Sequence, residues 1–315
     1  MKPAILLIGT TGQVGSELNR MLPRIGEVTA LDRRHLDLRQ PEEIRRAIRT
    51  FRPAFILNAA AYTAVDKAES EEAVAQAINA EAPAVMAEEA RTIGATLVHY
   101  STDYVFDGTK TIPYVEDDAT NPQNVYGRTK LEGELAIQAS GPAHLIFRTT
   151  WVYATQGRNF LLTILRLATQ RAELRIVRDQ IGAPTLSGEI AAATTNIIAR
   201  LCEAKTSSSS LADMSGVFHM TAGGETSWYE FANAILEEAA AIPASTPWFA
   251  AATGNLPLIT TRVIPIPASE YPVPARRPAY SVLSNARLGR AFSLQLPGWR
   301  KQLHSIFAAP PAITS

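Results

Sequence analysis

Two side chains that can move a proton, Tyr126 and Lys130, occur four residues apart in the segment Tyr-Gly-Arg-Thr-Lys. On a helix this spacing puts both side chains on one face. A free tyrosine has a pKa near 10, and a neighbouring ammonium group is expected to favour the phenolate and lower that pKa. The pair is therefore a candidate acid–base group, although ordinary surface pairs on helices have the same spacing.

A hydroxyl group occurs where a predicted strand ends. Ser101, Thr102 and Asp103 follow the apolar segment 96–100. Open α/β sheets bind ligands at the carboxyl ends of their strands, so the Thr102 hydroxyl is placed to hydrogen-bond a reacting carbonyl oxygen. A hydroxyl at this position can also satisfy the backbone of a turn, and the triplet by itself leaves both interpretations open.

Three glycines at a spacing of three, Gly9, Gly12 and Gly15, lie between the apolar segment 4–8 and a segment with helical periodicity, 12–22. Glycines let the backbone turn tightly and approach a pyrophosphate. The helix that follows offers free N–H groups and a partial positive charge to that anion. The pattern predicts a dinucleotide-binding turn, and the alternative is a purely structural glycine turn.

Charged residues that could select a cofactor follow the predicted strand 27–31. Asp32 lies about 20 residues beyond the glycines, where a carboxylate accepts hydrogen bonds from a ribose and favours NAD. Arg33 and Arg34 come next, and an arginine there pairs with a 2′-phosphate and favours NADP. We expect NADPH to be preferred and NADH to be accepted. Asn58 and three alanines follow the third predicted strand, where small residues leave room for a ligand or allow tight packing.

The elements that must position these residues alternate between strands and helices. Short apolar segments predict strands and 3.6-residue periodicity predicts helices; the strands are 4–8, 27–31, 54–57, 96–100 and 145–147, and the helices are 12–22, 41–51, 70–93 with a break at Pro83, and 125–139. This order indicates an α/β fold with a Rossmann-type, doubly wound parallel sheet. We expect residues 1–150 to form an NAD(P)-binding domain.

The alternation weakens after residue 150, where we expect a smaller, mainly substrate-binding domain over 151–315, with segments that return to the first domain. Helices are predicted at 159–170, 187–202 and 227–241, the last from a capping-box pattern at Ser227. A loop is predicted at 206–210, and loops around short elements at 243–274.

Composition limits the classes of function. The 315 residues include 30 Lys and Arg, 30 Asp and Glu, 46% hydrophobic residues and one cysteine, Cys202. A net charge of zero argues against an electrostatically driven nucleic-acid binder. One cysteine excludes an intrachain disulfide framework and a cysteine-cluster metal site. The apolar segment 4–8 is far shorter than the roughly 18 residues that a membrane span needs. We expect a cytoplasmic protein with no nucleic-acid or membrane partner.

Together the glycine triplet, Asn58, Thr102 and the Tyr126/Lys130 pair make the chain resemble the extended short-chain dehydrogenase/reductase superfamily. Within it, five longer stretches resemble dTDP-4-dehydrorhamnose reductases: 59–70, 100–106, 147–153, 179–185 and 274–278. The resemblance extends from residue 1 to about residue 300.

The resemblance implies NAD(P)H-dependent reduction of the C4 ketone of dTDP-4-dehydro-L-rhamnose to dTDP-L-rhamnose, the final step of dTDP-L-rhamnose biosynthesis. By motif position it implies the catalytic residues Thr102, Tyr126 and Lys130. Substrate-binding residues are expected at Thr102, Asp103, Trp151 and Arg276. The cofactor-binding residues are expected to be Gly9, Gly12, Gln13, Val14, Gly15, Asp32, Arg33, Asp37, Leu38, Ala61, Tyr62, Thr63, Tyr100, Tyr126 and Lys130.

The segment 276–301 is basic, with five arginines, one lysine and no acidic residue. Because guanidinium groups suit a diphosphate, we interpret it as support for an anionic substrate, the alternative being a solvated basic face. Some members of the family bind Mg²⁺ at a dimer contact through glutamates. Glu17 and Glu189 match two of these ligands, but the stretch 285–287 has no carboxylate. We therefore predict no metal site and a monomer or weak homodimer.

Two other functions remain open at this point. One is a related nucleotide-sugar reductase or epimerase with another product, such as a 6-deoxy-L-talose nucleotide. The other is a non-catalytic NADP-binding regulatory subunit, because the beta regulatory subunit of methionine adenosyltransferase resembles the same family. The joint presence of Thr102, Tyr126 and Lys130 favours an enzyme, since a binding module needs no proton donor.

Overall fold

The apolar segments of the first half form one parallel sheet in the computed structural model, which describes residues 2–204 and 214–308. Neighbouring strands lie in the order β10-β5-β4-β3-β1-β2, and every adjacent pair is parallel. The strands are β1 (Ala4–Ile8), β2 (Glu27–Leu31), β3 (Phe55–Asn58), β4 (Thr96–Thr102), β5 (His144–Thr149) and β10 (Gly216–His219). The edge strand β10 therefore comes from the second half of the chain.

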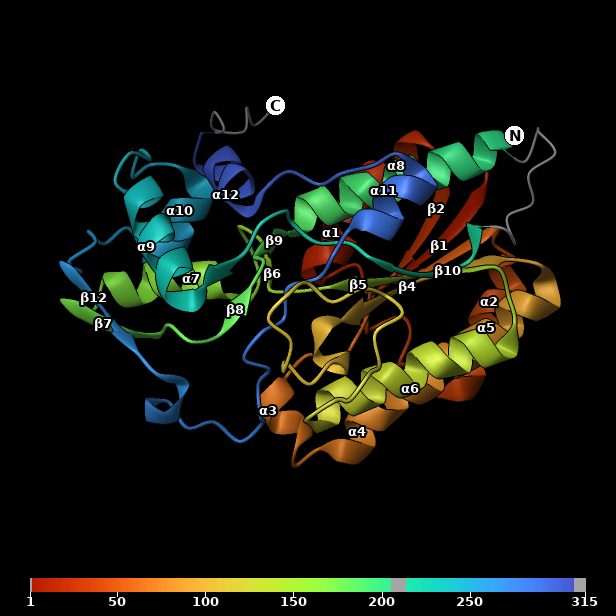
Figure 1. The fold of residues 1–315 in the computed structure, drawn as a ribbon. Helices are drawn as coiled ribbons and strands as arrows, with labels where there is room; N and C mark the ends of the chain where they lie inside the picture. The colour runs from red at the N-terminus through yellow and green to blue at the C-terminus, as the bar shows by residue number, and fades with distance from the viewer. Residues whose placement is uncertain (1, 205–213, 309–315) are drawn as a thin grey trace.

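Helices cover both faces of this sheet, which explains why its strands are continuously apolar. Side chains alternate along a strand, so Leu6 and Ile8 pack on one face while Ile5 and Leu7 pack on the other. The first face is covered by α2 (Pro41–Phe51), α5 (Ala82–Ile93) and α6 (Val125–Ser140). The second is covered by α1 (Gln13–Met21), α8 (Ser187–Ala204) and α11 (Ala286–Phe292) (Figure 1). The predicted Rossmann-type, doubly wound fold is confirmed.

The strand order reverses at β1, which lies between β2 and β3. The loops that leave β1 and β3 diverge from this point and open a crevice at the carboxyl end of the sheet. Two glycines allow the turn after β1 to lie against neighbouring backbone at positions where a side chain would clash. Gly9 has φ +91°, and a Cβ on it would lie 2.6 Å from Ala60 N. A Cβ on Gly15 would lie 2.0 Å from the Gly9 carbonyl oxygen.

A second lobe packs around the parallel pair β7 (Glu173–Val177) and β12 (Arg262–Ile266). Its helices are α7 (Phe160–Ala168), α9 (Trp228–Ala239), α10 (Pro247–Thr253) and α12 (Trp299–Ala308) (Figure 1). The predicted capping box begins α9: the Ser227 hydroxyl accepts from Glu230 N, and the Glu230 carboxylate accepts from Ser227 N. This reciprocal pair satisfies two N–H groups that the first helical turn leaves free.

Short elements join the two lobes. Two small pairs of strands are β6 (Val152–Tyr153) with β9 (Thr185–Leu186), and β8 (Ile181–Gly182) with β11 (Thr226–Ser227). The remaining helical segments are α3 (Val65–Ala68), α4 (Glu72–Gln76), a π-helical turn (Ala77–Glu81) and 3₁₀ turns at Leu22–Arg24, Asp103–Val105 and Ala268–Glu270. None of the helices in the described part of the chain has the length and hydropathy to cross a membrane.

The predicted helix 70–93 is interrupted, but the break lies before Pro83 rather than at it. Pro83 is in the first turn of α5 and has no N–H to donate to the residue-79 carbonyl. The chain widens into the π-helical turn there, and Asn79 in that turn is buried. Its side chain hydrogen-bonds the backbone of Tyr62 and the Thr129 hydroxyl. The loop predicted at 206–210 lies outside the described residues.

Candidate active site

A cavity of about 540 Å³ lies in the crevice where the strand order reverses. The loops after β1, β2 and β3 line it, together with the end of β4 and the start of α6. The predicted cofactor residues that line it are Gly9, Gly12, Gln13, Val14, Asp32, Arg33, Asp37, Leu38, Ala61, Tyr62, Thr63, Tyr100, Tyr126 and Lys130. Gly15 lies outside the lining, packed against the Gly9 backbone that forms the turn.

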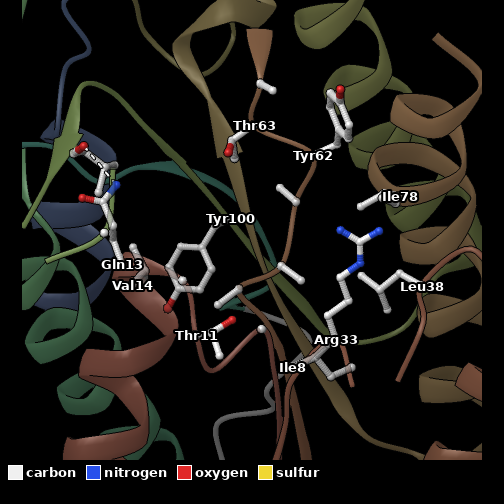
Figure 2. A pocket seen from close by; sticks show the side chains of 18 of the residues that line it. Ile8, Thr11, Gln13, Val14, Arg33, Leu38, Tyr62, Thr63, Ile78 and Tyr100 are labelled. Atoms are coloured by element: carbon white, nitrogen blue, oxygen red, sulfur yellow. Dashed lines mark hydrogen bonds between the residues drawn. The ribbon is translucent and has the colours of Figure 1, made fainter. Parts of the chain in front are cut away.

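One side of the cavity has the chemistry of a diphosphate site. The helix α1 begins there with Gly12 as its N-cap and no side-chain cap, so the N–H groups of its first turn are available to an anion. Gln13 and Val14 lie on this side of the pocket (Figure 2). The second half of the chain fixes Gln13, whose Nε2 donates to Val152 O at 3.4 Å and whose Oε1 accepts from Asn159 Nδ2 at 2.8 Å.

The opposite side carries the residues expected to select the cofactor. Arg33 lies there with Leu38 and Ile78 (Figure 2), and it forms no salt bridge with any residue in 2–204 or 214–308. The Asp32 carboxylate already accepts from the backbone of Arg34 and His35 and from the His35 ring, which lowers its pKa. An unpaired guanidinium beside the cavity fits a dinucleotide that carries a 2′-phosphate.

Tyr126 lines the inner end of the cavity, whereas Thr102 lies outside its lining. Tyr126 is half-buried in the first turn of α6, near the Thr102 side chain. Thr102 is buried at the end of β4, where its Oγ1 donates to Asp103 Oδ1 at 3.0 Å and accepts from Tyr104 N at 3.2 Å. These contacts fix the hydroxyl beside the phenol. The strand is two residues longer than predicted, so Thr102 belongs to β4 rather than to a turn.

The expected lowering of the Tyr126 pKa by Lys130 is wrong. Burial raises the pKa of the Tyr126 phenol to about 12, and the nearby Thr102 side chain opposes this rise. The Lys130 Nζ is directed elsewhere, 2.6 Å from Tyr100 O and 3.0 Å from His99 Nε2. Burial lowers the pKa of Lys130 to about 8. Tyr126 therefore keeps its proton at neutral pH, which is the form required of a proton donor.

Asp103 fixes the Thr102 and Thr150 side chains through hydrogen bonds to its carboxylate. Its carboxylate accepts from the Thr102 hydroxyl and from the Thr150 hydroxyl, the latter at 2.9 Å. The residue is buried, and burial raises its pKa to about 6 against the effect of these hydrogen bonds. Asp103 does not line the cavity, so its role in this structure is to orient Thr102.

Trp151 and Arg276, the other two expected substrate residues, lie outside the cavity lining. Trp151 has φ +45° and stacks on Trp228 with ring centroids 3.4 Å apart. Arg276 is exposed, and its carbonyl oxygen accepts from Asn124 Nδ2 at 2.7 Å. That bond ties the segment 274–278 to the start of α6.

The basic segment 276–301 does not form one continuous cationic site in the structure, and its interpretation as support for an anionic substrate stays a prediction. Three of its cations are paired with carboxylates from other elements. Arg277 pairs with Asp66 in α3 at 2.7 Å. Arg287 pairs with Asp117, and Arg300 pairs with Glu237 in α9 at 2.5 Å. Half of the cations in the segment are therefore engaged in separate ion pairs, and none of the six lines the cavity.

Sequence reasoning missed several residues at the site. Gly157 and Arg158 line the cavity from the loop after β6, and nothing in the local pattern marks them, because only the tertiary fold brings this loop to α1. Ser101 and Thr149 also line it, from the ends of β4 and β5. His99 was detectable in principle, because it is a single imidazole inside the otherwise apolar strand 96–100.

No site for a metal ion is found among residues 2–204 and 214–308, which contain no group of three or more His, Cys, Asp or Glu side chains suitable as ligands. Glu17 pairs with Arg20 at 2.6 Å. Glu189 is partly buried, and burial raises its pKa. Neither carboxylate is arranged as part of a cation site.

Known proteins share both the sequence and the fold. Residues 1–310 match the family described as "RmlD substrate binding domain". A dTDP-4-dehydrorhamnose reductase of Burkholderia thailandensis is 49% identical over 94% of this chain and 95% of its own length. The Escherichia coli K12 enzyme of that name is 43% identical, over 96% of this chain and 98% of its own.

A solved structure of dTDP-4-dehydrorhamnose reductase from Bacillus anthracis, in complex with NADP, superimposes with a TM-score of 0.84 at 31% identity, covering 98% of this chain and 99% of that one. Its similarity spans the cavity and both lobes described above. The chain belongs to the dTDP-4-dehydrorhamnose reductase family.

Proposed function

We propose that this chain reduces the C4 ketone of dTDP-4-dehydro-L-rhamnose to dTDP-L-rhamnose with NADPH, the final step of dTDP-L-rhamnose biosynthesis. The observation that carries the proposal is the Tyr126 phenol, which lines a cavity suited to a dinucleotide. The chain is also 49% identical to a protein named for this reaction. NADH is proposed as a second, weaker cofactor.

The residues present fit NADPH. The uncapped start of α1 would hold the pyrophosphate, and Arg33 would hold the 2′-phosphate. Lys130 would hold the nicotinamide ribose. Bound NADPH supplies a hydride.

Tyr126 and Thr102 act on the sugar carbonyl. As negative charge develops on the C4 oxygen, the Tyr126 O–H donates its proton to that atom, which completes the alcohol. Thr102 would orient the carbonyl oxygen by turning its hydroxyl hydrogen from Asp103 Oδ1 toward that oxygen when the substrate binds. Because the Tyr126 pKa is about 12, the phenol is protonated before the step. General acid catalysis of this kind contributes about 10²–10⁴-fold.

The test follows NADPH absorbance at 340 nm with dTDP-4-dehydro-L-rhamnose as substrate. The wild-type protein should consume one NADPH per sugar reduced, and NMR should identify the product as dTDP-L-rhamnose. An epimerase would consume none, and a non-catalytic subunit would bind NADPH without turnover. A 6-deoxy-L-talose product would place the hydride on the other face of C4.

The variant Tyr126→Phe should keep its fold and its NADPH affinity and lose about 10²–10⁴-fold in turnover, because only the proton donor is removed. Binding is measured by NADPH fluorescence and turnover at 340 nm. Tyr104→Phe is the matched control, since its ring contacts Tyr126 edge-on at 5.5 Å but is assigned no proton transfer. Near-normal turnover of Tyr126→Phe would reject Tyr126 as the acid.

We also propose that the protein acts in the cytoplasm, as a monomer or weak homodimer without a bound metal ion. A nucleotide-sugar substrate and a dinucleotide cofactor account for the cavity without a nucleic-acid or membrane partner. Trp151, Asp103 and Arg276 would contribute to the sugar-nucleotide site only if the substrate extends beyond the lined cavity toward the second lobe.

A further inference from the structure

A row of buried polar groups crosses the sheet beneath the cavity. Asn58 Nδ2, at the end of β3, lies 3.1 Å from His99 Nδ1 in β4. His99 Nε2 lies 3.0 Å from Lys130 Nζ in α6. The three residues are each about 1% exposed. Buried polar groups satisfy one another, so the position of each hydrogen in this row follows from its partners.

The orientation of the Asn58 amide fixes the first hydrogen. Ala60 N donates to Asn58 Oδ1 at 3.2 Å, so Oδ1 is the accepting end of the amide. The other end, Nδ2, therefore donates toward His99. His99 Nδ1 accepts that bond and carries no hydrogen of its own.

The His99 ring is neutral, because Nδ1 carries no hydrogen and burial holds the pKa of the ring well below the usual range. A neutral imidazole has one N–H group, and in His99 it must be on Nε2. Nε2 faces Lys130 Nζ, so Nζ has to accept this hydrogen. An ammonium group has no lone pair with which to accept. Lys130 in this arrangement is therefore a neutral amine, which uses one of its two hydrogens for Tyr100 O at 2.6 Å.

We propose that Asn58 and His99 are positioning residues that favour the neutral amine form of Lys130, and that above neutral pH Lys130 takes up a proton when NADPH binds. This inference rests on the proposed function. Lys130 lines the cavity, and the phosphates of NADPH favour the charged form of an amine in a buried site. The new ammonium would direct its additional hydrogen toward the cofactor.

The charged and titratable groups around Lys130 are consistent with this coupling. His99 faces it from β4, and Tyr126 and Glu134 belong to its own helix. Glu134 favours the ammonium, but its carboxylate is held by Arg148 of β5 at 2.7 Å. Burial is the larger effect and lowers the Lys130 pKa to about 8. Residues 2–204 and 214–308 place no unpaired anion beside Lys130, and the cofactor would provide one.

Proton uptake on NADPH binding tests the proposal directly. Calorimetric titrations at pH 9 in buffers of different ionisation enthalpy give the number of protons bound. With a Lys130 pKa of about 8, the wild-type protein should take up about 0.9 proton per NADPH. The 2′-phosphate adds nothing at this pH, because its pKa is about 6. The Kd for NADPH should rise about tenfold from pH 9 to pH 10.

Two substitutions, Asn58→Asp and His99→Gln, should remove the need for Lys130 Nζ to accept a hydrogen from His99. The carboxylate introduced by Asn58→Asp still accepts from Ala60 N but cannot donate, so the His99 hydrogen moves to Nδ1 and Nε2 accepts from an ammonium. His99→Gln adds no charge, and its amide can turn an oxygen toward Lys130. Both variants should bind NADPH with less proton uptake at pH 9 than the wild-type protein and with a smaller rise in Kd between pH 9 and pH 10. Wild-type uptake in either variant would overturn the proposal.

Nitrogen-15 NMR of the histidine rings gives an independent measurement on the wild-type protein, whatever the stability of the variants. His99, assigned through its contact with the Lys130 side chain, should carry its hydrogen on Nε2 before NADPH is added. A hydrogen on Nδ1 would contradict the inference. Failure of the wild-type protein to bind NADPH would reject the proposed function itself. Binding without proton uptake would reject only the role assigned to Asn58 and His99.

Discussion

Arg33 and Arg34 are adjacent in sequence but differ in their position at the cavity. Arg33 lines it and Arg34 does not. We expect Arg33→Ala to raise the Kd for NADPH about 10–100-fold and leave the Kd for NADH almost unchanged, because a charge-assisted hydrogen bond contributes about 1.5–3 kcal/mol. Arg34→Ala is the matched control and should leave both constants near wild type. Fluorescence titration measures the Kd of each variant for NADPH and for NADH. An equal loss of affinity for the two cofactors in Arg33→Ala would contradict this role.

Asp103 predicts a pH dependence of stability. Its pKa is about 6 in the folded protein, above the unfolded value of 3.8, so the folded state binds the proton more tightly. The stability it contributes is fully present below about pH 4 and is lost as the pH rises through 6, a change of up to about 3 kcal/mol. Urea unfolding of the wild-type protein and Asp103→Asn should show this loss only in the wild type. If the free energies of unfolding of the two proteins changed with pH in parallel, this contribution of Asp103 would be excluded.

The chemistry of single residues was partly predictable from sequence. The spacing of Tyr126 and Lys130 predicted a shared helix face, and both residues line the cavity. The direction of the Lys130 Nζ was not predictable, because its partners His99 and Tyr100 lie in a different element. The pKa of Tyr126 depends on the same long-range packing, and its expected direction was therefore wrong.

The turn between β1 and α1 requires glycine more strictly at position 15 than at position 12. A Cβ on Gly15 would lie 2.0 Å from the Gly9 carbonyl oxygen, whereas a Cβ on Gly12 would lie 3.4 Å from that atom. We expect Gly15→Ala to reduce the free energy of unfolding by about 1–3 kcal/mol or more, since backbone must move. Gly12→Ala should retain stability and weaken NADPH binding, because its methyl group lies in the cavity lining.

Thermal unfolding and NADPH titration of both variants separate these effects. Equal melting temperatures for Gly15→Ala and the wild type would show that the turn accommodates a side chain. Normal NADPH affinity in Gly12→Ala would show that the cofactor does not approach this part of the turn.

Elements were predicted well where one local signal decides them. The strands β1 and β2 and the helix α2 begin and end at the predicted residues, because each is a run of apolar or periodic residues between clear breaks. The π-helical turn was not predictable, since it depends on Pro83 and on the contacts of Asn79 with Tyr62 and Thr129. No pattern within the segment itself reports those contacts.

Assembly of the whole molecule should be independent of divalent cations. Glu17 is engaged by Arg20, and the stretch 285–287 offers no carboxylate. Light scattering should therefore give the same mass, that of a monomer or a weak dimer, with Mg²⁺ and with a chelator. A dimer that forms only with Mg²⁺ would contradict this expectation. Hard cations need several oxygen ligands, and two glutamates provide too few.

The organisation of the second half was the least predictable part of the molecule. The edge strand β10 has four residues, Gly216–His219, and pairs with β5. A segment this short carries no periodicity that distinguishes it from a loop. Its place in the sheet depends on apolar side chains such as Phe218, which packs with Phe147 and Phe292.

The elements β10, α8 and α11 follow β5 in the sequence, and this order has a consequence for folding during synthesis on the ribosome. A nascent chain that has emerged only to β5 exposes that strand's free edge and the apolar face that α8 and α11 later cover. An uncovered edge and apolar face attract other chains. Stable folding of the nucleotide-binding half must therefore wait until translation has passed α11, near residue 292. A gene fragment that stops at residue 150 should yield aggregated polypeptide rather than an isolated cofactor-binding unit.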